Sequence, residues 1–219
     1  FRSSIHDSFK LFYPQNEMYF RIPKTGIHSE KEITTYINNN PNLKETYIGS
    51  VNQYGYRHGY GRLISPSAKR IGTWQNGKFT GWGREIRNNG EVYEGKFENG
   101  KIYGKGIYKY KDILYIGDFE NNLRQGKGEK ITNRYYYNGY FNNDKPAGYF
   151  LKYGKDKKII FQGYLDQNYH IVKEGKIYFP NGDKYIGTFQ NDQLHGWGTY
   201  YFSKGDSWTG PFYNGKFHG

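Results

Sequence analysis

The sequence has 219 residues, a net charge of +12 at pH 7, no cysteine, and an aromatic fraction of 20% beside a hydrophobic fraction of only 35%. The absence of cysteine excludes a disulfide framework and thiolate metal sites, and the aromatic content argues against simple disorder. No apolar run approaches the roughly 20 residues of a membrane-spanning helix. Because 30 residues are glycine, we expect an all-β chain with many tight turns.

Residues 1–46 form a segment that shares no pattern with the rest of the chain. Ser29 followed by Glu32 resembles a capping box, which predicts a short helix over about 30–38 that ends before Asn40-Pro41. This segment is interpreted as a cap or a docking arm for the array that follows. It carries a charge of +1, so the remaining +11 lies in residues 47–219. That excess favours acidic partners, with simple solubility as the alternative.

Residues 47–219 contain a repeat of 22 to 24 residues that begins with the pattern aromatic-x-Gly-x-aromatic. Its glycine stands at Gly49, Gly72, Gly95, Gly117, Gly139, Gly163, Gly187 and Gly210. Two residues earlier stand Tyr47, Tyr93, Tyr115, Tyr137, Phe161, Tyr185 and Trp208, with Arg70 as the exception. Two residues later stand Val51, Trp74, Phe97, Phe119, Phe141, Leu165, Phe189 and Phe212. In a strand, these positions share one face.

Each repeat continues through a turn and a returning Gly-x-Gly strand. The pairs Asn76-Gly77, Asn99-Gly100 and Asn214-Gly215 predict type I′ hairpin turns. The returning glycines are Gly59/Gly61, Gly81/Gly83, Gly104/Gly106, Gly126/Gly128 and Gly196/Gly198. We expect these glycines to leave slots on one face for aromatic rings from neighbouring hairpins, so that Val at Gly104 or Gly126 would lower the melting temperature.

Enzyme signatures are missing from the sequence. Gly95, Gly100 and Lys101 have the spacing of a phosphate-binding loop, but Ile102 replaces the Ser or Thr that would hold Mg²⁺, and the same frame recurs twice. No Gly-x-Ser-x-Gly nucleophile elbow occurs. His58, His195 and His218 fall in repeats too far apart for all three to converge on a metal. We therefore predict no catalytic residue, no cofactor and no metal site.

The segments YEGKFENGKIYGKGIYKY (93–110) and YIGTFQNDQLHGWGTYYFSKGD (185–206) resemble MORN repeats, the membrane occupation and recognition nexus motif. The resemblance implies an all-β fold, an elongated, twisted, single-layer antiparallel sheet of about eight tandem hairpins. The eighth repeat is truncated in mid-unit, so the resemblance predicts continuation beyond Gly219. The fifth and sixth repeats depart from the pattern, with Phe150 at a glycine position and a glycine lost near Val172.

Two features are candidate contact sites for a partner. The middle residues of Gly-x-Gly include the aromatics Tyr60, Trp82, Tyr149 and Trp197, which face away from the glycine slots; the alternative is a second stacking row. A basic run near the irregular repeats comprises Lys145, Lys152, Lys155, Lys157 and Lys158; the alternative is a solvated loop.

The leading functional hypothesis is a non-catalytic scaffold that contacts other proteins in a multi-subunit assembly. The resemblance implies a cytoplasmic setting in the cytoskeleton or cilium, and homodimerisation is left open. One alternative is a peripheral module that binds anionic phospholipid, although the charges are dispersed. Another is an accessory domain beside a catalytic domain outside these residues. Nucleic acid ranks last, because the periodic rings are committed to one another.

Overall fold

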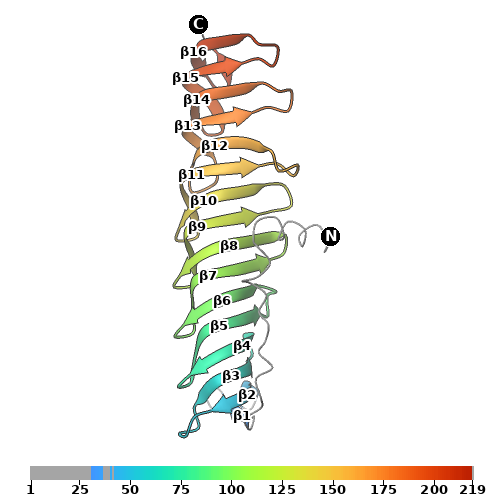
Figure 1. Cartoon of the computed structure of the whole chain (residues 1–219), viewed down its shortest axis with the longest axis vertical. Coiled ribbons are helices and arrows are strands. Elements are labelled where there is room, and N and C mark those ends of the chain that lie inside the picture. The colour runs from blue at the N-terminus through green and yellow to red at the C-terminus, as the bar shows by residue number, and fades with distance from the viewer. Residues whose placement is uncertain (1–30, 37–39, 41, 219) are drawn as a thin grey trace.

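The computed structural model describes residues 31–36, 40 and 42–218, which form one open antiparallel sheet of 17 strands and no helix (Figure 1). The strands are β1 (Lys31–Tyr36), β2 (Lys44–Val51), β3 (Arg57–Ile64), β4 (Ala68–Gln75), β5 (Lys78–Arg87), β6 (Val92–Glu98), β7 (Lys101–Tyr110), β8 (Ile113–Glu120), β9 (Leu123–Ile131), β10 (Tyr136–Asn142), β11 (Lys145–Tyr153), β12 (Ile159–Leu165), β13 (Ile171–Tyr178), β14 (Lys184–Gln190), β15 (Gln193–Tyr201), β16 (Ser207–Tyr213) and β17 (Lys216–Phe217).

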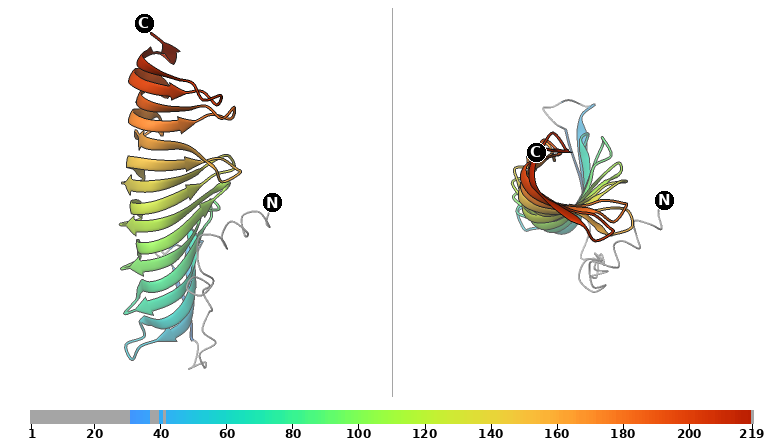
Figure 2. Two further views of the ribbon diagram at one scale, coloured as in Figure 1. Left: turned by 45° about the horizontal axis from the view of Figure 1, so that its top comes forward. Right: turned by 90° about the horizontal axis from the view of Figure 1, so that it is seen from above.

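Every strand pairs with its neighbours in sequence, so the order along the chain is also the order along the sheet. Sixteen steps of about 4.8 Å give an array roughly 75 Å long. Seen along its axis, the sheet is strongly curved, with a concave and a convex side (Figure 2). We call the concave side the inner face and the convex side the outer face.

The helix predicted near 30–38 is wrong where residues are described. Residues 31–36 form β1, which pairs with β2 from Lys31↔Gly49 to Tyr36↔Lys44. Ile33, Thr34 and Thr35 are β-branched and favour a strand, and the edge of the first hairpin supplies the partner. Residues 30, 37 and 38 lie outside the described residues.

The hairpin turns confirm the type I′ prediction. Asn76 and Gly77 have φ of 47° and 82°, and Asn99 and Gly100 have 50° and 82°. The turns that lack glycine have the same conformation, since Asn143 and Asp144 have φ of 48° and 68°. We call this edge of the sheet the turn rim; it comprises 52–56, 76–77, 99–100, 121–122, 143–144, 166–170, 191–192 and 214–215. The opposite rim comprises 65–67, 88–91, 111–112, 132–135, 154–158, 179–183 and 202–206.

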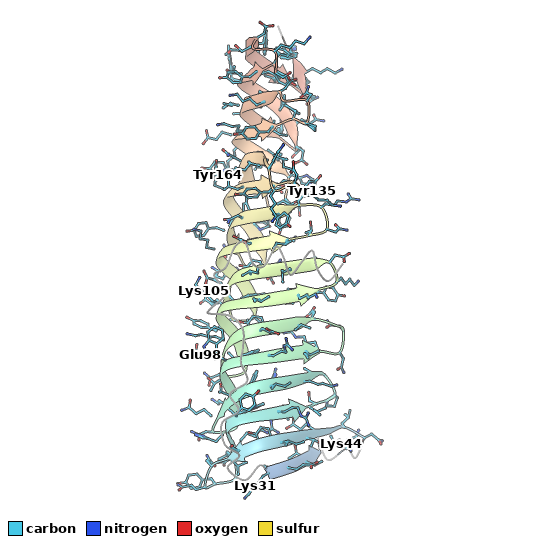
Figure 3. The ribbon with its side chains drawn as sticks, turned by 45° about the vertical axis from the view of Figure 1, so that its right-hand side comes forward. Lys31, Lys44, Glu98, Lys105, Tyr135 and Tyr164 are labelled. Atoms are coloured by element: carbon cyan, nitrogen blue, oxygen red, sulfur yellow. The ribbon has the colours of Figure 1, made fainter. Side chains whose placement is uncertain are left out.

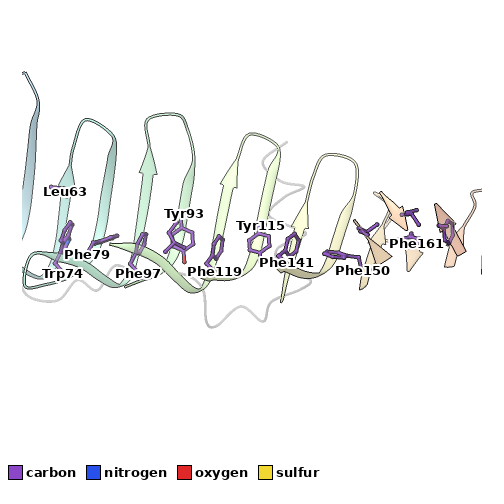
Figure 4. Close-up of a cluster of buried hydrophobic side chains, with 14 of the residues drawn as sticks. Leu63, Trp74, Phe79, Tyr93, Phe97, Tyr115, Phe119, Phe141, Phe150 and Phe161 are labelled. Carbon is purple, nitrogen blue, oxygen red and sulfur yellow. The ribbon is translucent and has the colours of Figure 1, made fainter. Parts of the chain in front are cut away.

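The core is a single row of rings on the inner face (Figure 4). Tyr93 illustrates the unit: its ring lies against Gly106 of the paired strand, where a Cβ would stand 2.3 Å from the Tyr93 hydroxyl. The hydroxyl donates to the carbonyl of Lys96 at 3.1 Å, which explains why tyrosine suits this position. The slot is therefore filled by the same repeat, whereas the sequence predicted a ring from the neighbouring hairpin.

Neighbouring repeats meet through ring-to-ring contacts. Tyr93 packs edge-on against Phe97 of its own repeat and Phe119 of the next, with centroids 5.1 Å apart in both cases. Tyr115 repeats this with Phe119 and Phe141, again at 5.1 Å. Such pairs contribute roughly 0.5–1.5 kcal/mol beyond area burial. The array is thus held together by nearest-neighbour terms.

The two glycines of Gly-x-Gly have different functions, which the sequence did not separate. Gly104 has φ of +66°, and a Cβ there would have no atom closer than 3.6 Å. It is the residue that absorbs the register shift of β7 against β6 between Gly95 and Phe97. Gly104 and its equivalent Gly126 (φ +74°) are bulge residues and not ring slots, so the slot prediction is wrong for both.

Candidate interaction surfaces

The outer face presents the aromatic residues from the middle of Gly-x-Gly. Trp82, Tyr149 and Trp197 are 40%, 50% and 68% exposed, whereas Tyr60 is half-buried. Lys96 lies 5.8 Å from the Trp82 ring and Tyr164 packs edge-on at 5.7 Å from Tyr149, so these rings have local partners. The register places Trp82 and Trp197 ten strands apart, or roughly 48 Å along the array.

The structure does not bring the predicted basic run together. Lys145 starts β11 at the turn rim, with its Nζ 2.9 Å from Gln167 Oε1. Lys155, Lys157 and Lys158 lie in the 154–158 loop on the opposite rim. Lys152 belongs to neither group, because its side chain lies on the inner face among tyrosines.

The inner lysine cluster, which the sequence reasoning missed, comprises Lys130, Tyr135, Tyr137, Lys152 and Tyr169. Lys130 of β9 and Lys152 of β11 stand directly opposite Tyr137 of β10, one on each side. Lys130 Nζ lies 3.9 Å from the Tyr169 ring centroid, and Lys152 Nζ lies 4.2 Å from that of Tyr135. The Tyr137 and Tyr169 rings meet edge-on at 5.2 Å. Tyr135, labelled in Figure 3, lies in the 132–135 loop.

Departures from the repeat build this cluster. Phe150 occupies the position of the second glycine, and its ring fills the slot over Gly139 that tyrosine fills elsewhere. Tyr137 is left half-buried on the surface of the inner face. The 166–170 loop is longer than a two-residue turn, and it carries Tyr169 to the inner face with φ of +69°. In the sixth repeat, which contains this loop, Lys173 replaces the glycine at the bulge and has a φ of +58°.

The lysines of the cluster are charged groups in a partly desolvated site. Burial, with a further contribution from Arg124, lowers the pKa of Lys130 to about 8. Burial also lowers the pKa of Lys152, against an opposing effect of Asp192. Neither lysine forms an ion pair with a carboxylate of the described residues. The Tyr169 hydroxyl is buried without a hydrogen-bond partner there.

A signal for this cluster was present in the sequence. The residue two positions after the second glycine faces inward in every repeat, and the equivalent positions hold Leu63, Glu85, Tyr108, Lys130, Lys152, Ile177 and Tyr200. A charged residue at such a position needs a partner. Glu85 has two, since Arg70 Nε and Arg87 Nε each lie 2.7 Å from its carboxylate. The two lysines contact tyrosine rings but no carboxylate of the described residues.

The remaining polar candidates are structural. Asp183, on the opposite rim, is only 8% exposed. Its carboxylate accepts hydrogen bonds from the Ser203 backbone N–H and the Tyr200 hydroxyl, both at 2.8 Å, which lower its pKa. Among the described residues, no three His, Asp or Glu side chains are grouped to hold a metal. That same part of the chain contains no helix long and apolar enough to span a bilayer.

An open meander of repeated hairpins with rings stacked on glycines defines an elongated repeat protein. The sequence model of the MORN repeat matches residues 47–68, 71–92, 93–112, 115–131 and 185–207, and the chain belongs to the MORN-repeat family. This repeat is a non-catalytic module associated with protein or membrane-lipid interaction. The matches pass over residues 132–184, which contain most of the inner lysine cluster.

Proposed function

We propose that this chain is a non-catalytic scaffold that holds other proteins along the outer face of its sheet. The observation that carries the proposal is the set of exposed rings at Trp82, Tyr149 and Trp197, which repeat at one position of the hairpin unit. Exposed aromatic side chains on a rigid sheet are the kind of anchor that protein interfaces use. The resemblance to repeat arrays of cytoskeletal and ciliary proteins supports a cytoplasmic assembly of that kind.

The length of the array supports the same proposal. A sheet about 75 Å long that buries little of itself offers several contact sites at set distances. The charge of +11 on residues 47–219 favours acidic partners. Peripheral attachment to anionic phospholipid is the competing function, and it would draw on the same charge without using the outer aromatic residues.

The test compares two double variants of the full chain in quantitative affinity purification from the native cell. Trp82→Ser with Trp197→Ser removes outer-face rings, whereas Tyr54→Ser with Tyr56→Ser removes two rings of the first turn-rim loop that are, on average, somewhat more exposed. We expect the tryptophan variant to lose its co-purifying proteins at least fivefold and the tyrosine variant to keep them. Equal retention by both variants would refute the outer-face scaffold.

A flotation assay with phosphatidylcholine vesicles, with and without 20% phosphatidylserine, addresses the competing function. The scaffold proposal expects no flotation at physiological salt. Salt-sensitive flotation that survives the tryptophan substitutions would favour the membrane module. Light scattering of the purified chain reports homodimerisation.

A further inference from the structure

We propose that the inner lysine cluster binds an acidic segment of a partner protein. The segment lies along the concave face, with one carboxylate on each side of the Tyr137–Tyr169 pair. The inference rests on the proposed scaffold function, and it names the chemistry of the partner at a second surface.

The first support is uncompensated charge. Lys130 and Lys152 are half-buried, and neither meets a carboxylate of the described residues. Arg124, the neighbouring cation, is already paired with Asp144 at 2.9 Å. The carboxylate that acts on Lys152 from a distance, Asp192, is already bonded to His170 and to the Ile171 N–H. Holding two ammonium groups in a partly desolvated site without an ion pair is unfavourable. One bound carboxylate beside each lysine would supply that ion pair.

The second support is an unused donor. The Tyr169 hydroxyl is buried and makes no hydrogen bond within the described part of the chain. Its ring closes the cluster against Tyr137 and Lys130. Buried hydroxyls normally have a partner, so the cluster contains one donor that the described residues leave unused.

The spacing of the lysines favours two carboxylates over one dianion. Lys130 and Lys152 stand two strands apart, so their Cα atoms are separated by roughly 10 Å along the array. An extended chain covers that span in about three residues. The tyrosine rings between the lysines would then contact the side chains between the two acids. One phosphate would need donors that converge, and here the ammonium groups rest on different rings.

The location of the cluster disfavours a bilayer. The lysines and rings lie on the concave side of the sheet, the side that also carries the core rings of Figure 4. A flat membrane would reach the rims and the outer face before it reached this surface. A single peptide chain is narrow enough to lie along it.

The test measures binding of a fluorescein-labelled 20-residue poly-L-glutamate to the full chain by fluorescence anisotropy at pH 7 and low salt. Poly-glutamate offers acids at every spacing, so it needs no prior choice of sequence. We expect Lys130→Met with Lys152→Met to weaken binding at least tenfold. The matched control, Lys155→Met with Lys157→Met, removes the same charge from the opposite rim and should weaken binding less than threefold.

Folding and competing outcomes are checked in parallel. Methionine removes a poorly solvated charge and keeps the aliphatic stem, so the melting temperature of the lysine variant should not fall. Equal losses from the two double variants would mean that net charge alone drives binding, and this would overturn the proposal. Binding of phosphatidylserine vesicles that depends on Lys130 and Lys152 would overturn it in favour of a membrane surface.

The scaffold and the acidic-segment proposals fail separately. If the full chain does not bind poly-glutamate while its co-purifying proteins still depend on Trp82 and Trp197, the acidic-segment proposal is refuted and the outer-face scaffold stands. If poly-glutamate binds through the lysines while co-purification is indifferent to the tryptophans, the outer-face scaffold fails and the acidic-segment site stands.

Discussion

Tyr93 and Gly106 form the unit from which the sheet is built: the tyrosine ring occupies the space that any side chain at Gly106 would need. The same relationship recurs with Tyr47 over Gly61, Tyr115 over Gly128 and Tyr185 over Gly198. Within the described residues, a layer only one sheet thick thereby gains a buried aromatic row with no second layer over it.

The two glycines of one strand should respond differently to substitution. Gly106→Ala places a methyl group 2.3 to 2.6 Å from the Tyr93 ring and hydroxyl, so we expect a loss of about 1–3 kcal/mol. Gly104→Asn fits an open left-handed position that asparagine tolerates, and should cost less than about 1 kcal/mol. Thermal melts of both variants check this. A larger loss at Gly104 would contradict the assignment of bulge and slot.

Phe150 should be indispensable to the fifth repeat. It is fully buried, its ring fills the slot over Gly139, and it packs edge-on at 5.4 Å against Phe141. Phe150→Ala should cost about 3–5 kcal/mol. The control is Tyr149→Ser, which removes the half-exposed neighbour on the outer face with its edge-on contact to Tyr164 and should cost only about 1 kcal/mol. Hydrogen exchange should locate the loss of protection in β10 to β12.

Asp144 links two neighbouring turns. Its Oδ1 accepts the backbone N–H of Arg124 at 2.8 Å and the Arg124 Nε at 2.9 Å. Asp144→Ala leaves the Arg124 N–H without its acceptor and removes a residue that tolerates the left-handed conformation. We therefore expect the free energy of unfolding to fall by about 1–2 kcal/mol. Asp144→Asn should be close to neutral, because Asn122 makes the same bond to Ile102 N at 2.8 Å one repeat earlier. Urea titration of the two variants tests the difference; equal losses would assign the effect to charge.

The stability of the array should rise in mild alkali as the buried Lys130 loses its charge. Its pKa is about 8 in the folded chain and about 10.5 when unfolded. Below pH 8 both states are protonated and the folded state carries the burial penalty. Between pH 8 and 10.5 the unfolded chain binds the extra proton, so stability rises with pH, by about 1 kcal/mol given the partial exposure of the ammonium group.

The measurement for Lys130 is the difference in melting temperature between the wild type and Lys130→Met from pH 7.5 to 9.5, because ionisation of the tyrosines is common to both chains and cancels in that difference. In the unfolded chain tyrosine ionises near pH 10, whereas burial raises the pKa of Tyr169 to about 12, an effect of opposite sign. Lys130→Met should remove the contribution of Lys130 and leave the smaller rise from Lys152, whereas Lys157→Met should follow the wild type. Parallel profiles of the wild type and Lys130→Met would contradict the burial of a charged Lys130.

The repeat period, the inward Tyr-x-Gly-x-Phe face and the I′ turns were readable from the sequence because each depends on residues close in the chain. The distinct tasks of Gly104 and Gly106 were not, since glycine is the only residue that serves both a positive φ and a close ring contact. The β1 strand was mistaken for a helix because the capping pattern at Ser29 and Glu32 is local, whereas strand pairing with β2 is not.

The inner lysine cluster required knowledge of the space between strands. Sequence spacing grouped Lys152 with Lys155 and Lys157, but alternation along β11 and the start of the 154–158 loop direct them to different surfaces. Lys130 and Tyr169, 39 positions apart, meet only because a loop after β12 reaches back over two strands. The candidate contact residues of the outer face were predicted from alternation alone, and their use by a partner remains a proposal.

The strictly sequential pairing of strands has a consequence for the speed of folding. The most widely separated strand partners, Ala68 and Arg87, are only 19 positions apart. Closing such short loops loses little chain entropy, so β-structure here avoids the slow, long-range searches of sandwiches and barrels. Any hairpin can serve as a nucleus, and growth can proceed in both directions as each repeat docks on the last. We therefore expect refolding that is fast for an all-β chain, with its rate little changed when one end is shortened by a whole repeat.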